Sequence, residues 1–201
     1  MPEETRIERQ LRYHATSFTA GREKRADSQE EALFIEGYFA VFNEIYVLWP
    51  GATESIAEGA FTEALKTCDV RALVNHNDDM VLGRAKSRTL TLREDAKGLW
   101  ARIEINPDDT DAMNLYARIK RGDVDQCSFG FIIAEEKTDY KEDGTIHWTI
   151  LRVDPLFEVS PVTFPAYEGT SVSARKREYE QIKKRADDAW REKMRKRLKE
   201  V

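Results

Sequence analysis

Three side chains in this sequence have the types needed for acyl-transfer chemistry: a serine, a histidine and a glutamate. Ser128 follows the stretch RGDVDQC and begins the apolar run SFGF. A serine hydroxyl is a weak nucleophile at neutral pH, and it needs an adjacent base such as a neutral imidazole. That base needs a third group, which holds its tautomer and stabilises the imidazolium. By default, a serine in a strand is a packing or hydrogen-bonding residue, and the sequence around Ser128 alone does not favour a nucleophile over that role.

His76 is the histidine best placed to act as the base. It lies in VRALVNHNDDMVLGR, after the apolar run 72–74 and before the polar residues NDD. This pattern puts it at the end of a predicted strand, where a side chain can face a cleft. His14, in RYHATSFT, lies on a predicted first strand and is interpreted as structural.

Glu158 is the candidate for the third group. It stands between Phe157 and Val159 in DPLFEVSPVTFPAY. A carboxylate on such an apolar strand should have a partner, because an unpaired buried charge is costly. The open alternative is a carboxylate that faces solvent from an edge strand.

Alternating apolar and aromatic residues predict that strands position these side chains. ALFIEGYFAVFN is one such run, with Gly37 as a bulge or bend. VLGRAKSRTLTLREDAKGLWARIEIN holds two runs joined by REDAKG, where Gly98 can take a positive φ. A further pair of strands surrounds the turn at Asp143 and Gly144, and a third run there ends at prolines.

Two helices interrupt the predicted strands. One is expected from about Phe61 to Thr67, and a second in TDAMNLYARIKRG, with Thr110 or Asp111 at its start and Gly122 at its end. The polar segment 20–31 is expected to be a mobile loop. Many strands and few helices predict an α+β fold that is mainly β: a closed or nearly closed antiparallel barrel with helices packed outside.

Composition is that of a folded protein. The chain has 201 residues, enough for one domain with a core, and 41% of them are hydrophobic. No run approaches the roughly 18 apolar residues of a membrane span, and the N-terminus lacks the apolar stretch of a secretory signal, so a cytoplasmic location is expected. Cys68 and Cys127 lie far apart without metal-type spacing, which favours free thiols.

Charge divides the chain into an acidic body and a basic tail. Residues 174–201 carry a net charge of +6, and the rest carries −11. Apolar residues recur in the tail every three or four positions, which predicts one amphipathic helix from about Arg175 to the end. We therefore divide the chain into residues 1–173 and a helical tail, 174–201. The tail could dock on an acidic partner, be a removable extension, or simply pack on its own domain; interleaved acidic residues make nucleic acid an unlikely ligand.

The ordered set GYFAVFN, EGAF, ALVNHN, LGR, DAKGLWARIEI, RGDVDQCSFGF and LFEVSPVTFPAY resembles the prohead maturation proteases of tailed bacteriophages. This family of serine endopeptidases is related in fold to herpesvirus assemblin, and the resemblance runs from about Ile35 to Ala174. It implies His76 as the base, Ser128 as the nucleophile and Glu158 as the acid. Because assemblin-type enzymes use a second histidine as third member, His147 competes with Glu158, and Asp154 is a weaker alternative.

The resemblance also implies a function. Such an enzyme cleaves the scaffold, or a scaffold-like part of the major capsid protein, and often itself, inside the immature prohead in the host cytoplasm. No metal or cofactor is implied, and assemblin-like dimerisation leaves a homodimer open. The oxyanion hole would lie near Gly130 or in the loop FPAYEG.

Two rival functions belong to other classes. The same fold could be a non-catalytic capsid assembly or scaffolding module, with the serine and histidine merely structural. Alternatively, His76, Asp78 and Asp79 in NHNDD could ligate a metal ion in a hydrolase. One histidine beside adjacent acids is poor zinc spacing, which disfavours the second rival.

Overall fold

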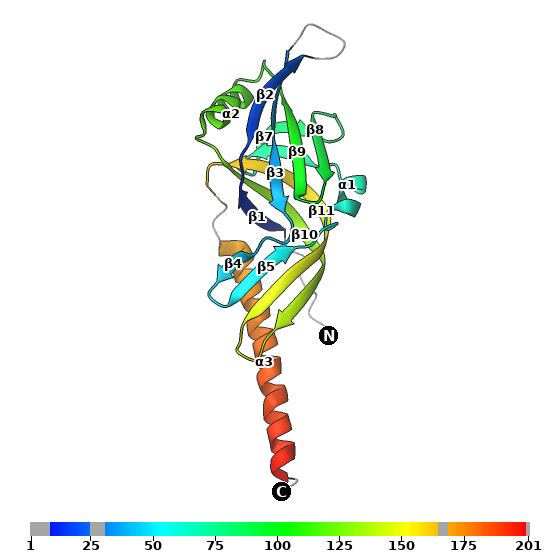
Figure 1. Ribbon diagram of the computed structural model, residues 1–201, viewed down its shortest axis with the longest axis vertical. Coiled ribbons are helices and arrows are strands. Elements are labelled where there is room, and N and C mark those ends of the chain that lie inside the picture. The colour runs from blue at the N-terminus through cyan, green and yellow to red at the C-terminus, as the bar shows by residue number, and fades with distance from the viewer. Residues whose placement is uncertain (1–8, 25–30, 165–168, 200–201) are drawn as a thin grey trace.

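The computed structural model describes residues 9–24, 31–164 and 169–199. Two β-sheets form an elongated body, and one long helix leaves the body at its lower end and extends beyond the sheets (Figure 1). The fold is mainly β with a few helices, as the strand-rich sequence predicts.

The candidate residues lie on strands of the larger sheet or in the turns next to those strands. The order of this sheet is β1-β10-β11-β5-β4, and β6 joins it by pairing with β11 while β7 pairs with β6. The strands are β1 (Gln10–Ala15), β4 (Tyr46–Trp49), β5 (Ala52–Ile56), β6 (Arg71–Val74), β7 (Asn77–Arg84), β10 (Gln126–Tyr140) and β11 (Ile146–Val162). Strand β10, which carries Ser128, therefore has β1 on one side and β11 on the other.

The hairpin of β10 and β11 turns at Gly144, whose φ of 83° confirms the predicted turn. The sequence predicts two separate runs after this turn, but β11 is one strand of 17 residues. It accommodates Pro155 because the register with β10 shifts between the pairs formed by Val153 and Leu156. At such a bulge the missing N–H of a proline is not required by the ladder.

The smaller sheet has the order β2-β3-β9-β8. Its strands are β2 (Thr19–Lys24), β3 (Glu31–Val41), β8 (Leu90–Glu94) and β9 (Gly98–Ile105). The predicted hairpin of β8 and β9 is present, but Gly98 does not have a positive φ. This position requires glycine for another reason: the backbone of Ala40 lies so close that a Cβ would collide with its carbonyl oxygen.

The predicted loop over residues 20–31 is wrong for its first part. Thr19–Lys24 form β2, which pairs antiparallel with β3 along its whole length. Polar composition concealed this strand because it is an edge strand and largely exposed. The remaining residues, 25–30, lie outside the described part of the chain.

The sequence predicts a closed or nearly closed antiparallel barrel, but the barrel is not closed and the larger sheet is not purely antiparallel. The strands form two sheets, and β11 pairs in parallel with both β5 and β6. Between these two strands the chain passes through helix α1 (Thr62–Thr67), so both run in the same direction along one edge of β11. Alternation within a strand identifies its buried face but not the direction of its neighbour, which is why periodicity could not reveal this.

Helix α2 (Thr110–Arg121) shows a cap one residue earlier than predicted. The side chain of Asp109 accepts hydrogen bonds from the N–H groups of Asp111 and Ala112, so Asp109 is the N-cap. Gly122 is the C-cap with φ of 89°, as predicted.

The main hydrophobic core contains alternate residues of β10. Cys127, Phe129 and Phe131 are fully buried in it, and the rings of Phe129 and Phe131 are stacked with centroids 4.9 Å apart. Side chains alternate between the two faces of a strand, so Ser128 and Gly130 point to the opposite face of the larger sheet. The Cys127 thiol donates to the carbonyl oxygen of Tyr38 at 3.3 Å.

Helix α3 (Gly169–Lys199) begins before the predicted start near Arg175. Tyr179 and Ile182 pack against the small apolar cluster around Trp148, whereas Trp190 and Leu198 farther along are 62% and 79% exposed. The first part of the predicted tail is therefore packed on the body, and the last part extends beyond it (Figure 1). No helix in the described residues combines the length and apolar character that a membrane crossing needs.

A buried ion cluster holds α3 and β1 to the sheet. The carboxylate of Glu54, on β5, is fully buried and binds the guanidinium groups of both Arg12 on β1 and Arg175 on α3. Arg175 also binds Glu136 on β10 and Glu178 on its own helix. The first strand and the beginning of the last helix are therefore held by one carboxylate.

The pKa of Glu54 reflects this cluster. Burial by itself raises the pKa, but the charges and hydrogen bonds of Arg12 and Arg175 more than offset it, so the pKa lies below its usual value. Because the folded-state pKa is lowered, the resulting stability is present above the usual glutamate pKa and is lost as the pH falls below it.

We predict that Arg175→Met lowers the free energy of unfolding at pH 7 by about 3 kcal/mol, because it leaves the buried Glu54 with one cation instead of two. The deficit should shrink as the pH falls through the pKa of Glu54 in the variant, where this carboxylate takes up a proton. Urea denaturation measures both effects. Lys184→Met, an exposed substitution on the same helix, is the matched control, and equal small losses in the two variants would contradict the prediction.

Candidate active site

Ser128 lies on β10 with a fully buried side chain. Its Cα pairs with Tyr13 on β1 and with Ser160 on β11. Its Oγ has no hydrogen-bond partner among the described residues. A buried hydroxyl without a partner costs free energy, so this serine is poorly explained as a structural residue.

His76 lies in the tight turn between β6 and β7. Asn75 and His76 both have positive φ, 50° and 60°, a conformation that is uncommon for histidine. The turn is tied to the end of β11: the Asn75 N–H donates to the Pro161 carbonyl at 3.1 Å, and the Asn75 Oδ1 accepts from the Thr163 N–H at 2.8 Å. These bonds hold the imidazole of His76 over the larger sheet.

Glu158 is the direct partner of His76. Its Oε1 lies 2.8 Å from His76 Nδ1, and the carboxylate is buried, with 2% of the side chain exposed. Ser160 donates its hydroxyl proton to Oε2 at 2.6 Å, and Arg9 donates from Nη2 to Oε1 at 3.0 Å. A carboxylate can only accept here, so Nδ1 carries the proton of the neutral imidazole and Nε2 is left as an acceptor.

The sheet register brings the serine to the same face as this pair. Ser128 is opposite Ser160, and Gly130 is opposite Glu158, so all four positions share one face of β10 and β11. The hydroxyl of Ser160 also accepts a hydrogen bond from the backbone N–H of His76 at 3.3 Å. His76 Nε2 is buried and, within the described chain, has no partner, like Ser128 Oγ.

Because Gly130 has no side chain, there is room beside it for the carboxylate of Glu158. A Cβ at this position would collide with Oε1 of Glu158 and lie 2.7 Å from Nε of Arg9. Any larger residue would displace the carboxylate from His76. The glycine two positions after Ser128 is thus a condition for the His76–Glu158 contact.

Comparison with known proteins decides the family. The sequence matches the caudovirus prohead serine protease family over residues 21–185. The chain belongs to this family. It is 33% identical over 144 residues to the prohead protease of Enterobacteria phage HK97, a match that covers 70% of this chain and 59% of the relative. The chain thus spans less than two thirds of the length of that curated relative.

A solved structure also resembles the fold. The bacteriophage T4 capsid assembly protease gp21 aligns with a TM-score of 0.48 and 15% sequence identity. The alignment covers 77% of this chain and 98% of the T4 chain.

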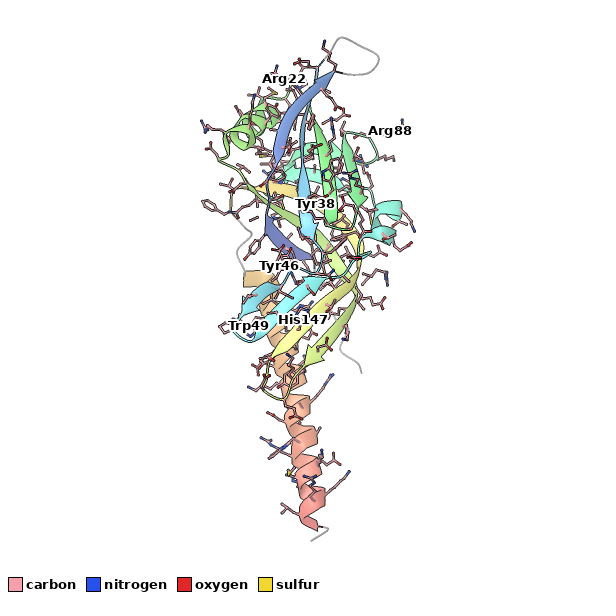
Figure 2. The ribbon with its side chains drawn as sticks, in the orientation of Figure 1. Arg22, Tyr38, Tyr46, Trp49, Arg88 and His147 are labelled. Carbon is pink, nitrogen blue, oxygen red and sulfur yellow. The ribbon has the colours of Figure 1, made fainter. Side chains whose placement is uncertain are left out.

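The two alternatives for the third group lie elsewhere in this member of the prohead protease family. The ring nitrogens of His147 form hydrogen bonds with the hydroxyls of Thr53 at 2.8 Å and Ser55 at 2.9 Å. His147 lies near the start of β11, whereas Glu158 lies near its end (Figure 2). Asp154 forms an ion pair with Arg152 at 3.6 Å, with both side chains over 40% exposed. The structure brings Glu158 to His76 and does not bring these two residues there.

The predicted metal ligands do not gather around His76. Asp78 and Asp79 are exposed at the start of β7, while His76 Nδ1 faces Glu158. In the described segments, no group of three or more histidine, cysteine, aspartate or glutamate side chains could hold a metal ion.

The two predicted positions for the oxyanion hole are Gly130 and the loop FPAYEG. Gly130 is paired with strands on both sides, so its N–H points along the sheet rather than toward the face of Ser128. Most of the other candidate, the loop FPAYEG, falls in residues 165–168, outside the described chain. The position of the oxyanion hole stays a prediction.

Two residues of the site were missed from the sequence. Ser160 stands two positions after Glu158, so strand alternation could have placed it on the same face. Arg9 gave no signal, because nothing local connects it with a residue 149 positions away. A cavity of about 540 Å³ adjoins Arg9 and Glu158, between the end of α1, the β6–β7 hairpin and residues 155–158 of β11.

We predict that Gly130→Ala destabilises the protein by about 1–3 kcal/mol, because the added methyl group forces the buried carboxylate of Glu158 to move. Chemical denaturation measures the effect. Ser128→Ala, two positions earlier on the same face, is the control: it removes an unpaired buried hydroxyl and should leave stability unchanged or raise it by up to about 1 kcal/mol. A Gly130→Ala protein as stable as the wild type would contradict the packing argument.

Proposed function

We propose that this chain is a serine endopeptidase of prohead maturation, with Ser128 as nucleophile, His76 as general base and Glu158 as the orienting acid. One observation carries the assignment of the residues: a partly buried imidazole, oriented by a buried carboxylate, shares a sheet face with a buried serine. The unpaired Nε2 and Oγ atoms are the two that must exchange a proton in acyl transfer.

The mechanism follows from these contacts. Ser128 Oγ attacks the carbonyl carbon of a peptide bond, and its proton passes to His76 Nε2, which then gives it to the leaving amine. Glu158 accepts from Nδ1–H throughout, which holds the tautomer and stabilises the imidazolium. The hydroxyl of Ser160 fixes the second carboxylate oxygen, so the carboxylate cannot rotate away.

Capsid proteins are the proposed substrates. The relative from phage HK97 is named a prohead protease, and the T4 protein a capsid assembly protease. Membership of the same family supports action on the scaffold, or on a scaffold-like part of the major capsid protein, inside the immature prohead in the host cell. Cleavage of the chain itself and a homodimer are part of the same proposal.

The last part of α3 is the proposed docking element. Beyond Ile182 the helix is mostly exposed and rich in lysine and arginine, whereas the body of the chain is acidic. These features support contact with an acidic capsid or scaffold surface, and self-cleavage could remove the helix after assembly.

We predict that Ser128→Ala abolishes cleavage of the coat and scaffold proteins on co-expression, with kcat reduced by about 10⁶-fold. Glu158→Gln should reduce kcat by roughly 10⁴-fold, because the amide can favour the wrong imidazole tautomer. Mass measurement of every fragment reports the cut sites and any self-processing. Equal coat shortening with Ser128→Ala and wild type would overturn the catalytic assignment and support the non-catalytic assembly module.

We predict that a chain ending at Lys184 keeps its peptidase activity within about twofold but is incorporated less into proheads. The truncation retains Arg175, Tyr179 and Ile182, which anchor the helix to the body. Peptide hydrolysis and quantification of the protease in purified proheads measure the two properties separately. Loss of hydrolysis would show that the distal helix supports the fold, and unchanged incorporation would remove its docking role.

A further inference from the structure

Arg9 contacts the candidate site but is not one of the three residues of the proposed mechanism. It stands just before β1, and its side chain passes over Gly130 to Glu158 on β11, where Nη2 donates to Oε1 at 3.0 Å. Its guanidinium carbon lies 5.6 Å from the ring centroid of Phe157, and 40% of the side chain is exposed. Arg9 therefore spans the strand that carries Ser128.

Other charged groups near Glu158 are engaged elsewhere or face solvent. Asp69, in the adjoining cavity, is bound by Arg84 at 2.8 Å from Nε. Arg71 pairs opposite Glu158 in the sheet, but its guanidinium binds the backbone carbonyl and carboxylate of Asp69. Asp78 lines the same cavity and is exposed. Arg9 is thus the arginine that contacts Glu158 among the described residues.

The shared oxygen couples Arg9 to the imidazole. Because Arg9 Nη2 and His76 Nδ1 both bind Oε1, these nitrogens lie within about 6 Å of each other, close enough for charges to interact. The guanidinium compensates the charge of the buried carboxylate when the imidazole is neutral. Without it, the remaining partners of the carboxylate are neutral, and the imidazole loses a nearby positive charge.

We propose that Arg9 is a positioning residue that holds the Glu158 carboxylate in place as the acceptor for His76 Nδ1, which leaves Nε2 available to accept the proton of Ser128. This inference rests on the proposed peptidase function. It makes the segment before β1 part of the site, and β1 is itself fixed by six register pairs with β10 and by the ion pair of Arg12 with Glu54.

The main test is the pH dependence of kcat/KM for a peptide substrate in the full chain. In Arg9→Gln the acid limb should move to higher pH by about half a unit to one unit, with a roughly three- to tenfold loss at pH 6 and less than twofold at the alkaline plateau. KM should change less than kcat. Arg9→Lys restores the charge and should return the limb toward the wild-type position.

Arg71→Gln is the matched control. It removes the same charge from the wall of the same cavity, but not the contact with Glu158, so its acid limb should stay at the wild-type position. An unchanged limb in Arg9→Gln, or an equal shift in both variants, would overturn the specific role of Arg9.

A second readout does not require peptidase activity. In a Ser128→Ala background, the proton on His76 Nδ1 should give a low-field ¹H resonance that Glu158→Gln abolishes. Adding Arg9→Gln should move it farther downfield, because Oε1 then accepts one fewer hydrogen bond and binds the imidazole more strongly. No movement would overturn the proposal. If the wild type hydrolyses no peptide, the proposed function fails, and this resonance still decides the contact of Arg9.

Discussion

The buried carboxylate of Glu158 is the constraint on which the rest of the site depends. A charge with 2% exposure must be met by donors, and here they come from three places: the β6–β7 turn, its own strand and the segment before β1. These donors can converge only because Gly130 on the intervening strand has no side chain. The same glycine thus allows both the packing of this sheet face and the orientation of the imidazole.

Strand β11 connects the candidate site with the opposite end of the larger sheet. One end carries Glu158 and Ser160 beside β6, which delivers His76 through its turn, and the other end pairs with β5. On β5, Glu54 binds arginines from β1 and α3, so a second buried carboxylate fastens the segments at both ends of the described chain. The strand that brings Arg9 to the site is therefore held by an ion pair distant in sequence.

The unpaired atoms of the site indicate function better than its stable contacts do. Ser128 Oγ and His76 Nε2 are buried and have no partner in the described part of the chain, and Asn75 and His76 in the turn both have positive φ. Each feature costs stability and would be removed by selection for stability alone. The chain belongs to the prohead serine protease family, and the proposed peptidase function would account for these costs by keeping a hydroxyl and a base available.

The sequence by itself determined which residue types could do the chemistry, the predominance of strands, the turn at Gly144 and the end of α2 at Gly122, because these depend on local pattern and local backbone conformation. Tertiary structure decided the rest. The parallel pairing of β11, the division into two sheets and the contact of His76 with Glu158 rather than with His147 arise between residues far apart in the chain. Arg9 is the clearest case, since long-range contacts with Glu158 and Phe157, which no local pattern encodes, place it at the site.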